Sequence, residues 1–224
     1  MVSIAIDGPS GAGKSTLARR LAAQLGYLYV DTGAMYRAIG LYALRRGADP
    51  SDEAAIAALL PGIHLALRWQ DGAQHILINE EDVSAYIRTE EVSMAASRVA
   101  ALPAVRAFLL ETQRCLAKTD NIVMDGRDIG TVVLPDAQVK VFLTATPEAR
   151  AKRRYAELIE RGEQAEYAQV LEDVRRRDKN DSSRAAAPLR RAESAVTLNT
   201  TDLTLESSFE ALCAIVRARV GEGA

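Results

Sequence analysis

A glycine-rich segment between an apolar run and a helical pattern constrains the fold of this chain more than any other part of its sequence. The segment follows the apolar residues 2–6 and precedes the helical pattern at residues 14–25. It consists of Gly8, Pro9, Ser10, Gly11, Ala12, Gly13, Lys14, Ser15 and Thr16. These residues fit G-x-x-x-x-G-K-[ST], a loop whose backbone N–H groups bind phosphates. A flexible glycine turn is the alternative, but it does not explain why motif, strand and helix coincide. The segment therefore predicts a strand–loop–helix unit that binds a nucleoside triphosphate.

Each part of this loop has an expected chemical task. The helix that follows places the positive end of its dipole behind the phosphates. Lys14 supplies a mobile charge for the β- and γ-phosphates. Its neighbour Ser15 is placed to reach Mg²⁺, and Thr16 carries the other hydroxyl that could do so. The loop thus predicts a donor nucleotide with Mg²⁺, and leaves the acceptor of the phosphate open.

The rest of the chain alternates between short apolar runs and helical patterns. The apolar runs lack polar alternation, as expected of parallel strands covered on both faces, and lie at residues 2–6, 28–30, 122–124, 139–143 and 195–198. The helical patterns lie at residues 14–25, 34–46, 103–118, 147–160, 167–179 and 205–220. Pro103 and Pro147 suit the first turns of their helices. This order predicts an α/β fold with a parallel sheet between helices.

One region departs from this alternation. Residues 63–69 and 75–79 alternate apolar and polar side chains, and residues 70–74 form a turn between them. The pattern predicts a small antiparallel hairpin. We expect one domain over 1–224, with a core at about 1–34 and 119–224 and an inserted lobe at about 35–118.

Composition narrows the class of protein. The 224 residues are 48% hydrophobic and 26% charged, and the net charge of −2 argues against general binding to nucleic acid. The sequence contains no apolar stretch near the roughly 20 residues that a bilayer requires. Cys115 and Cys213 show no metal-ligand spacing, and we expect both to be reduced and half-buried. We therefore expect a cytoplasmic protein that binds neither nucleic acid nor a membrane.

Three polar clusters follow predicted strands or helices. Residues 31–37 and 125–131 come at the carboxyl ends of strands, where open α/β sheets bind their ligands. The third cluster, residues 175–184, gathers several arginines with two acids at a predicted helix end. Each cluster also has a purely structural alternative. Residues 31–37 could cap a helix, residues 125–131 could form a plain turn, and residues 175–184 could be a solvated helix face. Arginines suit bidentate binding of phosphate, and an acid at residue 125 can orient Mg²⁺-bound water.

Taken together, these motifs resemble bacterial cytidylate kinase, a family of P-loop nucleoside monophosphate kinases. The resemblance rests on residues 7–14, 31–37, 125–131 and 177–189, and residues 87–97 resemble the inserted lobe of that family. It covers nearly the whole chain in the family's order. It implies a three-layer parallel-sheet kinase core with a small antiparallel-sheet lobe for the nucleoside monophosphate and a short helical lid at about 148–166.

The resemblance also implies roles for individual residues. The catalytic set would be Lys14, Arg127, Arg177 and Arg184. The CMP-binding set would be Ser10, Asp31, Thr32, Arg37, Ser97, Arg106, Asp125, Arg127, Asp128, Arg177, Asp181 and Arg184. Within this set, Ser97, Arg106 and Asp128 would read the cytosine, whose amino group suits a carboxylate and whose acceptors suit a hydroxyl and a guanidinium. Arg150, Arg153 and Arg154 would lie in the lid over ATP.

The implied activity is transfer of the γ-phosphoryl group of ATP to CMP or dCMP, with Mg²⁺, by a monomer. Other small-molecule kinases with the same loop are the alternatives, namely UMP/CMP, adenylate and shikimate kinases. A P-loop nucleotide switch is an alternative of a different class. The guanine-binding pattern Asn-Lys-x-Asp that would support it does not occur in the sequence, where residues 179–181 have the wrong order.

Overall fold

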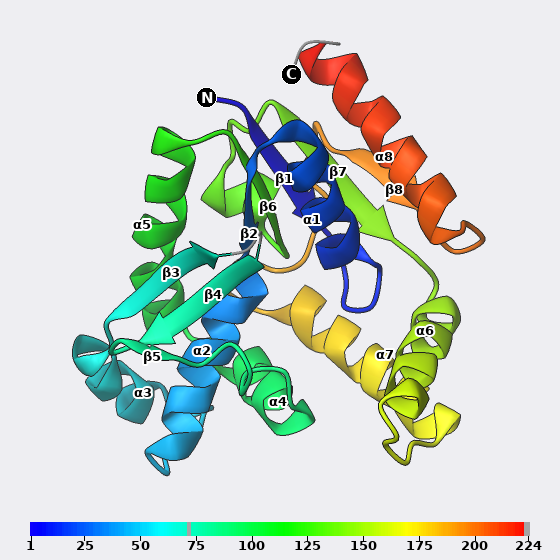
Figure 1. Cartoon of the computed structure of the whole chain (residues 1–224). Coiled ribbons are helices and arrows are strands. Elements are labelled where there is room, and N and C mark those ends of the chain that lie inside the picture. Colours follow the sequence, from blue (N-terminus) through cyan, green and yellow to red (C-terminus); the bar gives the residue numbers. More distant parts are fainter. Residues whose placement is uncertain (71–72, 222–224) are drawn as a thin grey trace. The chain divides into compact units, whose positions relative to one another are not determined.

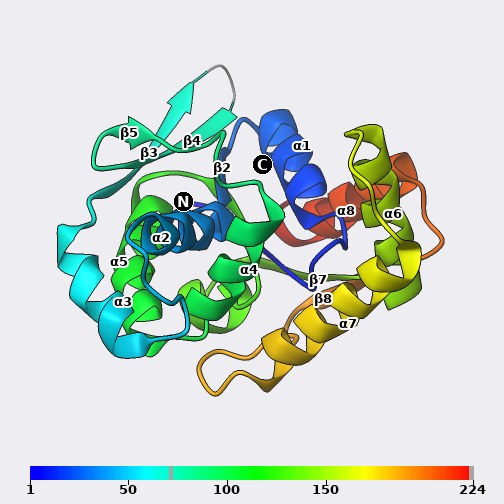
Figure 2. The ribbon, with the colours of Figure 1, turned by 90° about the horizontal axis from the view of Figure 1, so that it is seen from below.

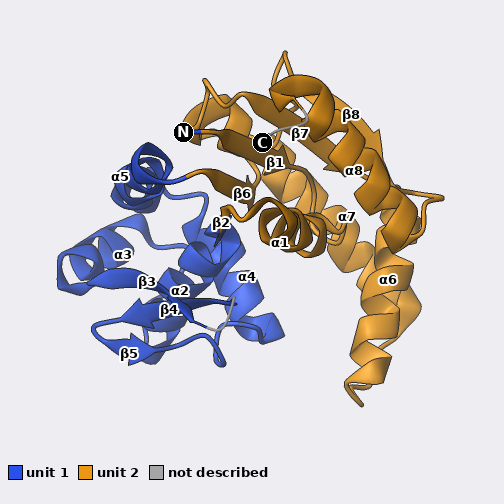
Figure 3. Ribbon diagram, turned by 45° about the horizontal axis from the view of Figure 1, so that its top comes forward, with its two compact units in different colours: residues 1, 29–120 blue, residues 2–28, 121–224 orange. Residues whose placement is uncertain are grey.

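The computed structural model describes residues 1–70 and 73–221. The chain divides into two compact units, which Figure 3 colours separately. Unit 1 comprises Met1 and Tyr29–Asp120, and unit 2 comprises Val2–Leu28 and Asn121–Ala224. Each unit has its own packing, and each is described by itself below.

Unit 2 is built on parallel strands. Strand β1 (Ser3–Asp7) pairs in parallel with β6 (Ile122–Gly126) and with β7 (Val139–Thr144), and β7 pairs in parallel with β8 (Val196–Asn199). The five-stranded sheet has the order β2-β6-β1-β7-β8; of its edge strand β2 (Leu28–Asp31), only Leu28 belongs to unit 2. Strand β6 is fully buried and β1 is buried except at Ser3, as the unbroken apolar runs predicted, whereas β7 alternates buried and half-buried residues. The α/β fold class and all five predicted strands are confirmed.

The helices of unit 2 follow the predicted order. They are α1 (Lys14–Leu25), α6 (Pro147–Glu160), α7 (Tyr167–Ser183) and α8 (Leu205–Val220). Helices α1 and α8 pack against each other and against the sheet (Figure 1). Helices α6 and α7 lie side by side around Ala151, Val170 and Val174 (Figure 2). The predicted helix 167–179 ends later, at Ser183, and its additional turn carries Asp181, which pairs with Arg127.

A turn of π-helix, Ile129–Val133, follows β6 and was not predicted. Its first two N–H groups, those of Ile129 and Gly130, donate to the carboxylate of Asp7 at distances of 2.7 and 2.8 Å. Because the acceptor lies more than a hundred residues away in the sequence, no local pattern marks this turn.

Unit 1 contains helices and an antiparallel sheet around a separate core. Its helices are α2 (Thr32–Arg45), α3 (Glu53–Leu59), α4 (Glu90–Val99) and α5 (Pro103–Thr119), with a short 3-10 turn at Leu60–Gly62. Its sheet has the order β3-β4-β5, from Leu65–Gln70, Ala73–Ile78 and Glu81–Asp82. The predicted hairpin is confirmed, with Leu65 paired to Ile78. Part of its predicted turn, residues 71–72, lies outside the described residues.

Three elements of unit 1 were missed from the sequence, namely α3, α4 and β5. Helix α4 has a readable signal, since its buried residues Val92, Ala95, Ala96 and Val99 follow helical spacing and Thr89 caps its first turn. Among the described residues, no single helix has the length and apolarity of a membrane span. Helices α4 and α5 pass that test only as a pair, bent by 97°.

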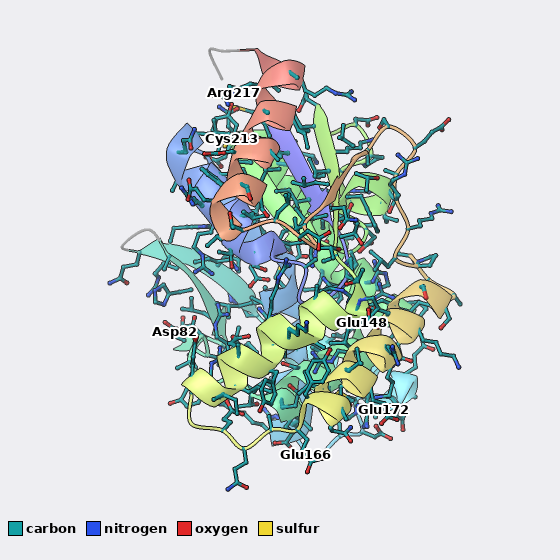
Figure 4. All side chains as sticks on the ribbon, turned by 90° about the vertical axis from the view of Figure 1, so that its right-hand side faces the viewer. Asp82, Glu148, Glu166, Glu172, Cys213 and Arg217 are labelled. Carbon is teal, nitrogen blue, oxygen red and sulfur yellow. The ribbon has the colours of Figure 1, made fainter. Side chains whose placement is uncertain are left out.

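The expectation that both cysteines are half-buried was wrong. Cys115 is exposed, whereas Cys213, labelled on α8 in Figure 4, is buried. Helical periodicity alone did not distinguish these two positions, because their exposure depends on which elements pack against α5 and α8.

Candidate active site

The glycine-rich loop connects β1 to α1 and depends on close backbone contacts. Gly8 has φ of +150°, and a Cβ at this position would lie 1.9 Å from the carbonyl oxygen of Leu143. Gly13 caps the N-terminus of α1 in a left-handed conformation with φ of +94°. A residue without a side chain is therefore required at Gly8, and it is strongly favoured at Gly13. A loop backbone without side chains at these positions fits a site where N–H groups contact a phosphate directly.

Lys14, the first residue of α1, is buried and its Nζ donates to the carbonyl oxygen of Pro9 at 2.8 Å. Burial, followed by repulsion from Arg127, lowers the pKa of Lys14 to about 7. The carboxylates of Asp125, Asp181 and Asp7 act in the opposite direction. The buried ammonium group is thus easily deprotonated in the free protein, and added negative charge next to it would restore its full charge.

Ser15 lies one residue further along α1 and faces the end of β6. Its Oγ donates to Oδ2 of the buried Asp125 at 2.9 Å, whereas Thr16 is exposed. A hydroxyl next to a carboxylate is a pair of hard oxygen ligands, which is the donor type that Mg²⁺ prefers. The residues present therefore fit a Mg²⁺ ion shared with nucleotide phosphates, with Ser15 as the hydroxyl.

Arg127 and Asp181 form an ion pair between the end of β6 and α7. Nε of Arg127 donates to Oδ2 of Asp181 at 2.8 Å. Burial opposes both charges, but each partner stabilises the other, so the pKa of Asp181 is lowered and that of Arg127 is raised. Both side chains therefore keep their charges near neutral pH.

The remaining predicted residues of this cluster lie around the same pair. Arg184 directly follows α7, and its Nη2 lies 4.0 Å from Oδ1 of Asp181. Arg177 is half-buried and lies on α7 one turn before Asp181. Asp128 is buried just after β6, at the residue before the π-helical turn. Unit 2 thus gathers predicted residues from α1, from β6 and the residues after it, and from the end of α7, which are distant in the sequence.

Asp7 is a residue of this site to which the sequence analysis gave no role. It is buried, and burial raises its pKa to about 6 despite the two N–H groups that it accepts from the π-helical turn. This carboxylate fixes the turn that begins at Asp128. Its position at the end of β1, directly before Gly8, was the only sequence signal.

The three arginines assigned to the lid lie in different surroundings. Arg150 is buried and makes hydrogen bonds to the carboxylate of Asp178 and to backbone carbonyls. Arg153 donates to the hydroxyl of Thr200 at 3.2 Å. Arg154 pairs with Glu157 at 3.0 Å on the surface of α6. The structure therefore does not present the three as one equivalent group.

Unit 1 carries an ion pair at the start of α2. Asp31 caps this helix, since its Oδ1 accepts from the N–H of Ala34 at 2.9 Å, and its Oδ2 accepts from Nη2 of Arg37 at 2.8 Å. Burial opposes ionisation, but Arg37, Ala34 and the exposed Arg88 together hold the pKa of Asp31 below its usual value. The capping alternative is confirmed, and it coexists with the ion pair. Arg88 is a further cation of this cluster that the sequence analysis did not assign.

Two contacts bring the other predicted residues of unit 1 next to α2. A Cβ at Gly40 would lie 2.9 Å from the backbone N of Ala96, so α4 can approach α2 closely at the residue before Ser97. The guanidinium of Arg106 lies 5.8 Å from the centroid of the Tyr36 ring. Thr32, the first residue of α2, is buried. Unit 1 therefore presents a carboxylate, hydroxyls and guanidinium groups on α2 and the helices packed against it.

The family model and the curated relatives identify the same family. The cytidylate kinase family model matches residues 4–218. A cytidylate kinase from Caldicellulosiruptor bescii is 49% identical over 209 residues, which cover 93% of this chain and 92% of the relative. One from a Geobacillus species is 47% identical over 220 residues, which cover 98% of each. A solved shikimate kinase structure from Bacteroides thetaiotaomicron has a TM-score of 0.49 at 14% identity and covers 96% of this chain and 98% of its own. The chain belongs to the cytidylate kinase family.

Proposed function

We propose that this protein is a nucleoside monophosphate kinase that transfers the γ-phosphoryl group of ATP to CMP or dCMP. The observation that carries the proposal is the buried cluster in unit 2, where Lys14, Ser15 and Asp125 lie next to the Arg127–Asp181 pair. Such a cluster combines phosphate-binding cations with a magnesium-type ligand pair, which is what transfer between two phosphates requires. The family match over residues 4–218 favours CMP over the acceptors of other P-loop kinases.

The donor nucleotide would bind to the loop from Gly8 to Thr16. The backbone N–H groups of the loop and the start of α1 would hold the phosphates, and Lys14 would reach the β- and γ-phosphates. Ser15 and Asp125 would hold Mg²⁺ together with phosphate oxygens. When bound, that ion neutralises charge on the phosphates.

The roles proposed for the acceptor-binding residues follow from the resemblance to the family. Arg37, Arg127, Arg177 and Arg184 would bind the phosphate of the acceptor, and Asp31, Thr32, Asp125, Asp181 and Ser10 would position the nucleotide. Ser97, Arg106 and Asp128 would read the cytosine. We also propose that unit 1 corresponds to the lobe that binds the monophosphate, and that the α6 region, residues 148–166, acts as the lid.

The chemistry then depends on positioning and charge rather than on a general base. The attacking oxygen belongs to a phosphate that is already ionised near neutral pH, so no side chain has to remove a proton from it. The arginines would instead neutralise the charge that spreads over the transferring group. Closure over the substrates would exclude water and limit hydrolysis of ATP.

An ADP-release assay with a panel of acceptors tests the proposed function. We expect CMP and dCMP to be used far better than AMP, GMP or shikimate. Equal use of all acceptors would contradict it, and very slow turnover with each, combined with nucleotide-dependent binding of another protein, would indicate a switch instead. The cytoplasmic location and the monomeric state stay predictions, to be checked by cell fractionation and sizing.

A single substitution sharpens this test. Asp128→Ala is expected to depress the use of CMP much more than the binding of ATP, since its carboxylate would accept from the cytosine amino group. Asp136→Ala is the matched control, because Asp136 is an exposed aspartate eight residues further along the same connection. A similar loss of ATP and CMP binding in Asp128→Ala would remove this residue from cytosine recognition.

A further inference from the structure

Arg150 is buried at the first turns of α6, with only 2% of its surface exposed. All three guanidinium nitrogens donate hydrogen bonds. Nε donates to the carbonyl oxygen of Ala145 at 2.9 Å, and Nη1 donates to that of Ser10 at 3.1 Å. The carboxylate of Asp178 accepts from Nη1 at 2.8 Å and from Nη2 at 2.5 Å. A bidentate pair of this kind fixes the guanidinium in one orientation.

The contact with Ser10 fixes a peptide of the phosphate-binding loop. Because a peptide unit is planar and trans, its N–H points away from its carbonyl oxygen. The Ser10 carbonyl points at Arg150, so the N–H of Gly11 in the same peptide points in the opposite direction. A second contact supports this orientation, since a Cβ at Gly11 would lie 3.3 Å from Cβ of Arg150. The side chain of Arg150 therefore sets the direction of one N–H donor of the loop.

The contact with Asp178 connects the same arginine to α7. Asp178 comes directly after Arg177 and one helical turn before Asp181, which pairs with Arg127. Helices α6 and α7 lie side by side, as Figure 4 shows from another direction, and an apolar cluster holds them together. A displacement of α7 would therefore be transmitted through Asp178 and Arg150 to the loop.

We propose that Arg150 is a positioning residue that couples the phosphate-binding loop to α7. This inference rests on the proposed function and extends it, since the coupling would hold the donor site and the arginines of α7 in register. It also gives Arg150 a different role from a lid residue that reaches over ATP. To contact a phosphate, its guanidinium would have to leave Asp178 and the Ser10 carbonyl.

Three variants and one control test the proposal. Arg150→Lys keeps the charge and the aliphatic stem but cannot bond Asp178 and Ser10 in the same way. Asp178→Asn removes the charge of the partner, and Arg150→Met removes the guanidinium. Glu206→Gln is the control, because Glu206 forms an exposed pair with Arg20 that joins α8 to α1, at 2.6 Å. It lacks the contact with the loop.

Two readouts separate positioning from mere structural support. Equilibrium binding of ADP is expected to weaken about tenfold in Arg150→Lys, and kcat/KM for ATP to fall about 100-fold, as for a displacement of about 1 Å near the reacting groups. We expect KM for CMP to change less than twofold, and the control to match the parent in every constant. In a double-mutant cycle, Asp178→Asn should add little to Arg150→Lys, because both remove the same coupling.

Other results would overturn the proposal. Arg150→Lys with a lower Tm but unchanged ADP binding and kcat/KM for ATP would show a structural role only. A normal ADP affinity with a 100-fold lower kcat, and no effect of Asp178→Asn, would show that Arg150 acts directly on the transferring group. If Arg150→Met does not fold, Arg150→Lys and Asp178→Asn still decide. ADP binding is independent of the acceptor, so its loss in Arg150→Lys supports the coupling even if the wild-type protein does not use CMP.

Discussion

Binding of nucleotide should draw a proton onto Lys14. The ordinary pKa of 10.5 falls to about 7 because the side chain is buried and lies near Arg127. Phosphates placed next to Nζ would raise the pKa again by direct attraction. At about pH 8 the free protein would hold Lys14 neutral in about 0.9 of the molecules, so binding would take up about 0.9 proton. At about pH 6 the uptake would be only about 0.1 proton.

The sign of the pH dependence follows from this linkage. The bound state has the higher pKa, so affinity is greatest below pH 7, where Lys14 is already charged. Above pH 7 the affinity should fall by up to about tenfold per pH unit. Asp7, with a pKa raised to about 6, also titrates in the lower part of this range. The measurement at about pH 8 is therefore the cleanest, since Asp7 is ionised there.

Calorimetric titration with ADP measures the uptake directly. The observed heat in buffers of different ionisation enthalpy gives the number of protons exchanged, and ADP avoids turnover. Lys14→Arg is the control, because a guanidinium stays charged across this range. Equal uptake in the wild type and this variant at about pH 8 would refute the reasoning, as would a wild-type uptake that does not rise between pH 6 and 8.

Three further predictions concern single substitutions. Arg127→Ala should lower kcat by roughly 100-fold, with an ATP KM within about threefold of the parent, because its charge would act at the transferring group; near-normal turnover in steady-state kinetics would contradict this. Gly8→Ala should lower stability by about 3 kcal/mol or more, because the new Cβ would overlap the Leu143 carbonyl oxygen, and an unchanged Tm would exclude that clash. Asp31→Ala should lose about 1 kcal/mol through its cap on Ala34, measured by denaturant unfolding. Asp31→Asn should keep most of that stability yet bind CMP more weakly, so equal CMP affinity would argue against a role for its charge.

Local chemistry made most of the fold predictable from the sequence. The glycine-rich loop is a contiguous motif, and its strand and helix flank it directly. Pro103 and Pro147 mark the first turns of α5 and α6 because a proline lacks the N–H that an interior helical turn requires. The alternation of apolar and polar residues at 63–69 and 75–79 predicted the hairpin. This signal is also local, because successive side chains in a strand point to opposite faces of the sheet.

The sequence also supplied the candidate site, but only as separate segments. It identified Asp31 and Arg37 six residues apart on one helix start, and the structure joins them in an ion pair. It could not show that Arg127 pairs with Asp181, because 54 residues separate them and many other pairings of the arginines were possible. It likewise gave no role to Asp7 or Arg88, because the groups with which they interact, the N–H groups of Ile129 and Gly130 for Asp7 and the carboxylate of Asp31 for Arg88, are far away in the sequence.

The sequence by itself therefore determined the class of fold, the donor-binding loop and the family that the chain resembles. The tertiary structure decided which of its many charged side chains are buried and which partners they have. Arg150 illustrates the difference, because the resemblance to the family placed it in a lid over ATP, whereas in the structure its guanidinium bonds Asp178 and the carbonyl of Ser10, 140 residues away in the sequence. Burial and charge pairing depend on which groups lie close in space rather than in the sequence. The pKa values of Lys14 and Asp7 are shifted for the same reason, by burial and by charges that the fold brings near them.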